Sequence, residues 1–148
     1  MMTGTRFEIS GEPLVAGEAT GLALAADEPL SLWGGYDAVT GTIIDRRHPL
    51  AGHAASGRVL VVPFSRGSST TTAVLLESIR AGTAPAAIVT TGRDTFFALA
   101  SIVASELYGR SVPVIVVSTD DFARLQTGDE IDITPDGQMR VCRRAGQR

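Results

Sequence analysis

Three short apolar runs alternate with two helix-like segments in the second half of the chain, and this order most limits the folds open to it. The runs are Val59 to Val62, Ala86 to Val89 and Val114 to Val117. The first predicted helix begins at the Ser-Ser-Thr-Thr-Thr segment and ends near Arg80, with Gly82 as its stop. Short apolar runs separated by helices are typical of buried parallel strands. The second half is therefore predicted to be βαβαβ.

The second predicted helix, over 95–108, carries its own start and stop signals. Asp94 is a suitable N-cap, and Gly109 follows the last helical residue. Apolar residues recur along it at i, i+4, i+7 and i+11, namely Phe96, Ala100, Val103 and Leu107. This spacing predicts one apolar stripe that faces a sheet.

Strand and turn signals dominate the remaining parts of the chain. Glycine and proline interrupt residues 6–32 at short intervals, which predicts an antiparallel β start. Residues 34–57 are glycine-rich and form a predicted long ordered loop. Near the end, Ile131 and Ile133 alternate before a Pro-Asp-Gly turn, which indicates a hairpin. With only two helices to cover the sheet, we expect one α/β domain over residues 1–148, built as three layers, β/β/α.

Composition excludes several classes of function. All thirteen basic residues are arginine, so the chain has no lysine for a Schiff base or a phosphate-binding P-loop. A net charge of −3 argues against nucleic acid as a partner, because phosphate backbones need a basic face. Cys142 is the only cysteine and can hold neither a disulfide nor a metal centre alone. The sequence has no signal-peptide pattern and no run near the ~20 apolar residues that span a bilayer. We therefore expect a soluble, cytoplasmic protein with no membrane partner.

The segment from Val62 to Thr72 is the strongest candidate for chemistry. It runs from a predicted strand through Pro-Phe-Ser-Arg-Gly into a hydroxyl-rich helix start. The free N–H groups and positive dipole end of a helix favour an anion there, and open α/β sheets bind ligands at the carboxyl ends of strands. The simpler interpretation is that Ser68 or Ser69 only caps the helix.

Other known site patterns fit poorly. The chain has no G-x-S-x-G elbow and no G-x-G-x-x-G at a helix start, which disfavours an ordinary hydrolase and a dinucleotide-binding domain. His48 and His53 lie five residues apart after Asp45, a spacing that is not specific for a metal. We interpret both histidines as solvated or locally hydrogen-bonded.

Five segments, in order, resemble the small subunit of aconitase X, the swivelling domain of a divergent branch of the aconitase superfamily. They are EPLSLWGG with DAVTGTIIDRRHPL, GRVLVVPFSRGSSTT, RAGTAPAAIV, ASELYG with VPVIVV, and LQTGDEIDI. The resemblance covers nearly the whole chain. It implies a β/β/α swivelling domain in a hydro-lyase (dehydratase), active only with a larger partner subunit. That partner holds an iron–sulfur cluster and most of the substrate pocket, while this chain alone holds no metal.

The same resemblance implies roles for individual residues. Ser68 corresponds by position to the serine described as the catalytic base of better-known aconitases. Supporting or substrate-binding roles are expected for Arg66, Gly67, Ser69 and Thr70. The 34–57 loop is expected at the partner interface, with candidates Asp37, Asp45, Arg46 and His48. The expected substrate is cis-3-hydroxy-L-proline. The alternatives are the small subunit of phosphomevalonate dehydratase and a non-catalytic scaffolding subunit.

Overall fold

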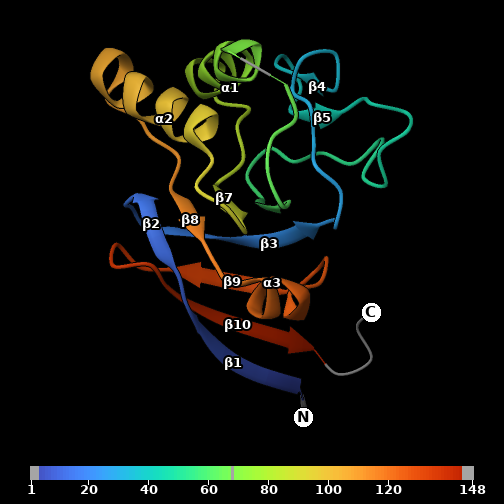
Figure 1. Ribbon diagram of the computed structural model, residues 1–148, viewed down its shortest axis with the longest axis vertical. Coiled ribbons are helices and arrows are strands. Elements are labelled where there is room, and N and C mark those ends of the chain that lie inside the picture. Colours follow the sequence, from blue (N-terminus) through green and yellow to red (C-terminus); the bar gives the residue numbers. More distant parts are fainter. Residues whose placement is uncertain (1–3, 68, 145–148) are drawn as a thin grey trace.

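A mixed sheet forms the frame of the molecule in a computed structural model that describes residues 4–67 and 69–144 (Figure 1). Its strand order is β1-β10-β9-β3-β6-β7-β8-β2. The strands are Gly4–Ser10 (β1), Glu12–Val15 (β2), Ala19–Ala25 (β3), Val59–Val61 (β6), Ala87–Thr90 (β7), Val114–Val116 (β8), Glu130–Ile133 (β9) and Gln138–Arg144 (β10). The helices are Ser69–Ala81 (α1), Thr95–Tyr108 (α2) and Thr119–Arg124 (α3), and a separate small pair is Tyr36–Asp37 (β4) with Thr42–Ile43 (β5).

The sheet is divided into two layers at β3. Residues 19–22 of β3 pair antiparallel with β9, whereas residues 23–25 pair parallel with β6. The antiparallel strands β1, β10 and β9 thus form one layer, and the parallel strands β6, β7 and β8 lie above it beneath α1 and α2 (Figure 1). This confirms the predicted β/β/α layers.

Both faces of the parallel strands are buried, which explains their unbroken apolar sequence. On β6, Leu60 points to the core beneath the helices, whereas Val59 and Val61 point to the core between the two layers. The same alternation sends Leu24 of β3 to the helix side and Ala23 to the other side. Two apolar cores therefore share one set of strands.

The predicted orientation of α2 is wrong. The side chains it buries are Phe97, Ala100, Ser101 and Ala104, while Phe96 and Leu107 are 36% and 64% exposed. Ser101 can be buried because its hydroxyl donates to the carbonyl of Val112 at 2.6 Å and accepts from the Val112 N–H at 2.7 Å. The apolar stripe expected from Phe96 to Leu107 therefore does not face the sheet.

Local signals at the helix ends and the hairpin are confirmed. Asp94 caps α2 by accepting from the Phe97 N–H at 3.0 Å, and Gly109 follows in the left-handed conformation. Gly82 has a φ of +80° just after α1. The C-terminal hairpin pairs β9 with β10.

Other predictions for the ends of the chain need correction. The early strands do not pair with each other, because β1 pairs with β10, β2 with β8 and β3 with β9 and β6. The count of two helices missed α3, whose six residues are too few to show a helical period. The 34–57 loop contains the β4–β5 pair. Within the described residues, every helix is too short or too polar to span a bilayer.

Candidate functional site

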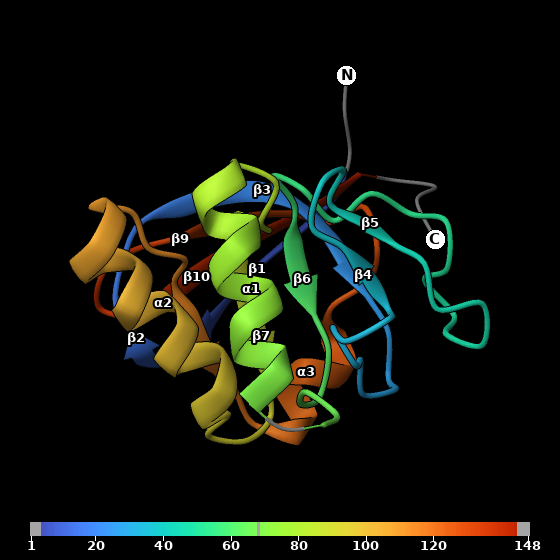
Figure 2. The same cartoon turned by 90° about the horizontal axis from the view of Figure 1, so that it is seen from above.

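The candidate site lies where the parallel strands end and the helices begin. The loop after β6 leads into α1, and the loop after β7 leads into α2, so the first turns of both helices meet at the lower edge of the molecule in Figure 2. We call residues 63–67, between β6 and α1, the strand-end loop. Both helix N-termini carry positive partial charge at this edge, which makes it suited to an anionic group.

The backbone of the strand-end loop is held by two neighbours. The Leu30 N–H donates to the Phe64 carbonyl at 3.3 Å, and the Arg66 N–H donates to the Leu30 carbonyl at 3.0 Å. The Ser65 N–H donates to Asp94 Oδ2 at 2.6 Å. Asp94 is 8% exposed and accepts from α2 through its other oxygen, so one carboxylate joins the loop to a second helix. The sequence pointed to Asp94 as a cap but gave no sign of this second role.

Gly67 ends the strand-end loop with a conformation that favours glycine. Its φ is +121°, and a Cβ built on it would lie 3.6 Å from Thr71 Oγ1 and 3.8 Å from Ser31 Oγ. Two hydroxyl groups thus face the Cα of Gly67, one from α1 and one from the loop after β3. The surroundings of Gly67 at the start of α1 are therefore polar.

Two buried hydroxyls at this junction have no hydrogen-bond partner among residues 4–67 and 69–144. They are Ser65 Oγ and Thr71 Oγ1, and we call them the unpaired hydroxyls. Thr71 is completely buried. An unpaired buried polar group typically costs about 1–3 kcal/mol. Such groups need an explanation, and one explanation is a function that supplies the partner.

The structure gathers several of the predicted site residues at this edge. Arg66 and Gly67 are exposed in the strand-end loop, Ser69 is exposed at the start of α1, and Thr70 is partly buried in its first turn. Ser68, the predicted base, lies outside the described residues. The predicted strand-to-helix junction is present between β6 and α1, while its role as a site and the role of Ser68 stay predictions.

A cavity of about 350 Å³ opens beside the strand-end loop. Its lining residues are Phe64, Ser65, Gly92, Arg93, Asp94, Thr95 and Phe96. Phe64 and Phe96 are both exposed, so this rim is partly apolar. A larger hollow of about 500 Å³ lies between the end of β3 and α3. Of the predicted site residues that the structure describes, none lines either one. The larger hollow is lined by no residue of the strand-end loop, whereas Phe64 and Ser65 of that loop line the smaller cavity. We therefore centre the site on the smaller cavity.

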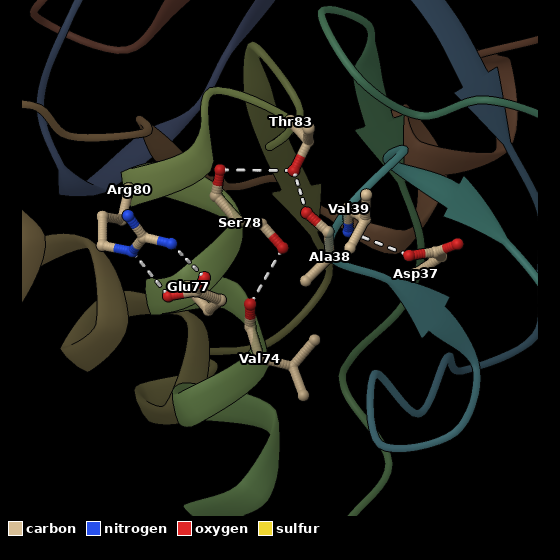
Figure 3. Close-up of polar contacts among 8 residues, drawn as sticks. All are labelled: Asp37, Ala38, Val39, Val74, Glu77, Ser78, Arg80 and Thr83. Carbon is tan, nitrogen blue, oxygen red and sulfur yellow. Dashed lines mark hydrogen bonds and ion pairs between the residues drawn. The ribbon is translucent and has the colours of Figure 1, made fainter.

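The interface candidates are spread over the 34–57 loop. Asp37 lies in the β4–β5 hairpin, where its Oδ1 accepts from the Val39 N–H at 2.9 Å, near the C-terminal end of α1 (Figure 3). Asp45 Oδ1 accepts from the Arg47 N–H at 3.0 Å, and Arg46 is exposed. Asp37 is thus at the opposite end of α1 from the strand-end loop.

The two histidines have different environments. His48 is buried, with Nδ1 accepting from the Leu50 N–H at 3.1 Å and Nε2 3.2 Å from the Glu28 carbonyl. This pairing matches the tautomer with a proton on Nε2, because only a nitrogen that carries a proton can donate to a carbonyl. His53 is exposed. In the described part of the chain, no three His, Cys, Asp or Glu side chains gather where they could hold a metal.

Comparison with known proteins places the chain in a family. The family model for the aconitase X swivel domain matches residues 8–141. This chain belongs to the aconitase X swivel-domain family. A solved structure, the holo-form of aconitase X from Thermococcus kodakaraensis, superposes with a TM-score of 0.81 at 27% identity, covering 91% of this chain and 98% of that chain.

Relatives of the aconitase X swivel domain carry two names. Cis-3-hydroxy-L-proline dehydratase of Pseudomonas aeruginosa is 52% identical over 101 residues, which is 68% of this chain and 17% of that protein. Phosphomevalonate dehydratase small subunit of Methanothermobacter thermautotrophicus is 31% identical over 136 residues, 90% of this chain and 99% of that protein. The chain spans less than a fifth of the length of the Pseudomonas relative and nearly all of the archaeal one.

Proposed function

We propose that this aconitase X swivel domain is the small subunit of a dehydratase, in which its strand-end loop and the start of α1 complete an active site with a large subunit. The observation that carries the proposal is the arrangement of the strand-end loop at the start of α1. Asp94 and Leu30 fix the strand-end loop at a helix N-terminus, where hydroxyls are buried without partners in the described part of the chain. Such an edge suits the binding of an anionic substrate.

In this proposal, Ser68 is the base that removes a carbon-bound proton from the substrate while the adjacent hydroxyl leaves as water. A serine hydroxyl as acidic as bulk water needs ~9 pKa units, about 12 kcal/mol, to ionise at neutral pH. A helix N-terminus supplies ~0.3–2 kcal/mol. Even with the help of Arg66, two residues earlier in the sequence, this chain cannot supply the rest, so the base must be completed by donors or cations from the partner. A closed, dry, two-chain site follows from this shortfall.

A large subunit is also needed for the iron–sulfur cluster that the family resemblance implies. Cluster sites in proteins use about four cysteine ligands, and this chain has one cysteine. Cys142 lies on β10, and the described residues offer it no group of metal-ligating neighbours. The residues of this chain do not fit a cluster, so we assign the cluster to the large subunit and give this chain the work of binding, orientation and proton removal.

The proposed substrate is cis-3-hydroxy-L-proline. The Pseudomonas relative of that name is 52% identical, against 31% for the archaeal phosphomevalonate dehydratase small subunit. An amino-acid substrate needs a group for its carboxylate, which Arg66 and the start of α1 can provide. A phosphate needs several arginines, and Arg46 and Arg47 keep mevalonate 5-phosphate as the second candidate.

Reconstitution tests the proposal. We expect the purified chain to fold alone without dehydratase activity and to gain it when mixed with a cysteine-bearing large subunit. The complex should act on cis-3-hydroxy-L-proline with a kcat/KM far above that for mevalonate 5-phosphate. The reverse order would select the second substrate. An active isolated chain free of iron would contradict the shared site, and a complex inactive on both substrates would favour the scaffolding role.

A further inference from the structure

The hydroxyl of Thr71 is the polar group in the described structure whose position the fold explains least. Thr71 lies in the first turn of α1, is fully buried and has no hydrogen-bond partner among residues 4–67 and 69–144. A helical hydroxyl often donates to the carbonyl four residues earlier, as Ser78 does to Val74 at 2.8 Å on the same helix. For Thr71 that residue is Gly67, which precedes the helix.

The Thr71 hydroxyl faces the last residue of the strand-end loop. A Cβ on Gly67 would lie 3.6 Å from Thr71 Oγ1, so the two residues are close neighbours. Two residues before Gly67 in the sequence, the buried hydroxyl of Ser65 is also without a partner within the described residues. In the sequence, the unpaired hydroxyls therefore lie before and after Arg66 and Gly67.

The strand-end loop combines fixed points with a point of freedom. Hydrogen bonds to Leu30 and Asp94 hold the backbone of residues 64–66. Gly67 follows with a φ of +121°, and glycine allows rotation there at low cost. A change of the backbone angles at Gly67 would turn the Gly67 carbonyl relative to Thr71 Oγ1 while the anchors at 64–66 stay in place.

Valine has nearly the shape of threonine but no hydroxyl to desolvate, so it would suit this buried position better in the free chain. We propose that Thr71 is a positioning residue of the dehydratase site. Its hydroxyl gains a hydrogen-bond partner in the strand-end loop when that loop takes its working conformation against the large subunit and substrate. The inference rests on the proposed function and assigns it a residue outside the predicted site.

Thr71→Val and Thr71→Ser test this, with Thr83→Val as the matched control. Thr83 lies just beyond the other end of α1, and its hydroxyl donates to the Ala38 carbonyl at 2.6 Å (Figure 3). We expect Thr71→Val to raise the Tm of the free chain by about 2–4 °C, but not the Tm of the complex. Its kcat in the complex should fall at least about tenfold with KM within about twofold, and Thr71→Ser should restore kcat. Thr83→Val should lower Tm and keep kcat.

Each remaining outcome has a definite meaning. An active complex in which Thr71→Val keeps kcat within about twofold of the wild type overturns the inference. A lower Tm of the free Thr71→Val chain also overturns it, because the hydroxyl would then already be paired. If the wild-type complex has no dehydratase activity, the proposed function fails. The Tm values of free chain and complex then still decide whether assembly gives Thr71 a partner.

Discussion

The two ends of α1 differ in how their polar groups are used. Beyond the C-terminal end, Thr83 donates to the Ala38 carbonyl, and the hydroxyl of Tyr36 donates to the Thr83 carbonyl at 2.8 Å. Ser78 in the last turns donates to Val74 (Figure 3). At the N-terminal end, the hydroxyls of Ser65 and Thr71 are buried without partners in the described ranges 4–67 and 69–144.

This difference separates a structural clamp from a candidate site on one helix. The C-terminal end fastens the β4–β5 hairpin to the domain, and each of its buried hydroxyls stabilises the chain as it stands. At the N-terminal end, the hydroxyls of Ser65 and Thr71 gain no such bond from residues 4–67 and 69–144. A buried group that costs stability in isolation indicates a role in the assembled protein.

Removal of the Asp94 carboxylate should have the largest effect on the N-terminal end. Asp94→Ala removes the cap of α2 and leaves the Ser65 N–H unpaired, so we expect a loss of about 2–4 kcal/mol in the free energy of unfolding. Activity of the folded complex should also fall, because the strand-end loop loses its anchor. Urea unfolding beside kcat measures both. Asp94→Asn keeps one acceptor oxygen but turns its NH2 group toward the other backbone N–H, so it should recover only part of the stability. A stable Asp94→Ala chain would show that the loop is held by other groups.

A pair of glycine substitutions compares the two ends directly. Gly67 and Gly82 both have positive φ, at +121° and +80°, and neither has a neighbour within 3.4 Å of an added Cβ. Alanine should therefore cost about 1–3 kcal/mol at each position through backbone strain. Only Gly67→Ala should also lower the kcat of the complex when activity is expressed per folded molecule. Equal activity of the two variants would remove the functional distinction between the ends.

The smallest expected effect is a change of stability at alkaline pH, and it concerns the bonds between Thr83 and the β4–β5 hairpin at the C-terminal end of α1. Burial raises the pKa of the Tyr36 phenol well above its usual value. A raised pKa favours the neutral form in the folded state, so this stability is present below the unfolded pKa of about 10 and is lost as pH rises above it. At neutral pH, Tyr36→Phe should lower the free energy of unfolding by about 1 kcal/mol, because the bond to the Thr83 carbonyl is lost. Above pH ~10, the variant should lose less stability than the wild type does, because it has no phenol to ionise. Parallel pH curves for both proteins would rule out Tyr36 as the source.

The sequence predicted those parts of the fold that depend on local signals. Buried on both faces, β6, β7 and β8 appear as apolar runs, and Asp94, Gly82 and Gly109 mark helix ends through short-range chemistry. Pairing of β1 with β10 joins residues more than a hundred positions apart, and no local pattern specifies it. The orientation of α2 was missed because Ser101 is buried through a bond to Val112 that periodicity cannot show.

The candidate site also has features that the local sequence predicts and features that it does not. Its location follows from a strand that runs into a hydroxyl-rich helix start, which the sequence displays between Val62 and Thr72. The anchoring of the strand-end loop cannot be predicted from the sequence, because the bond from Ser65 to Asp94 and the pairing with Leu30 depend on tertiary contacts. The unpaired hydroxyls are likewise visible only when the surrounding atoms are in place.

Ser68→Ala in the reconstituted complex tests most directly whether the N-terminal end of α1 is catalytic. If Ser68 is the base, kcat should fall by ~10²–10⁴ with kcat/KM falling in parallel, because a methyl group cannot take the proton. Ser69→Ala, its neighbour, should cost less. If Ser68 only caps the helix, the change should cost about 1 kcal/mol of stability. A destabilised Ser68→Ala complex with full activity per folded molecule would contradict the account.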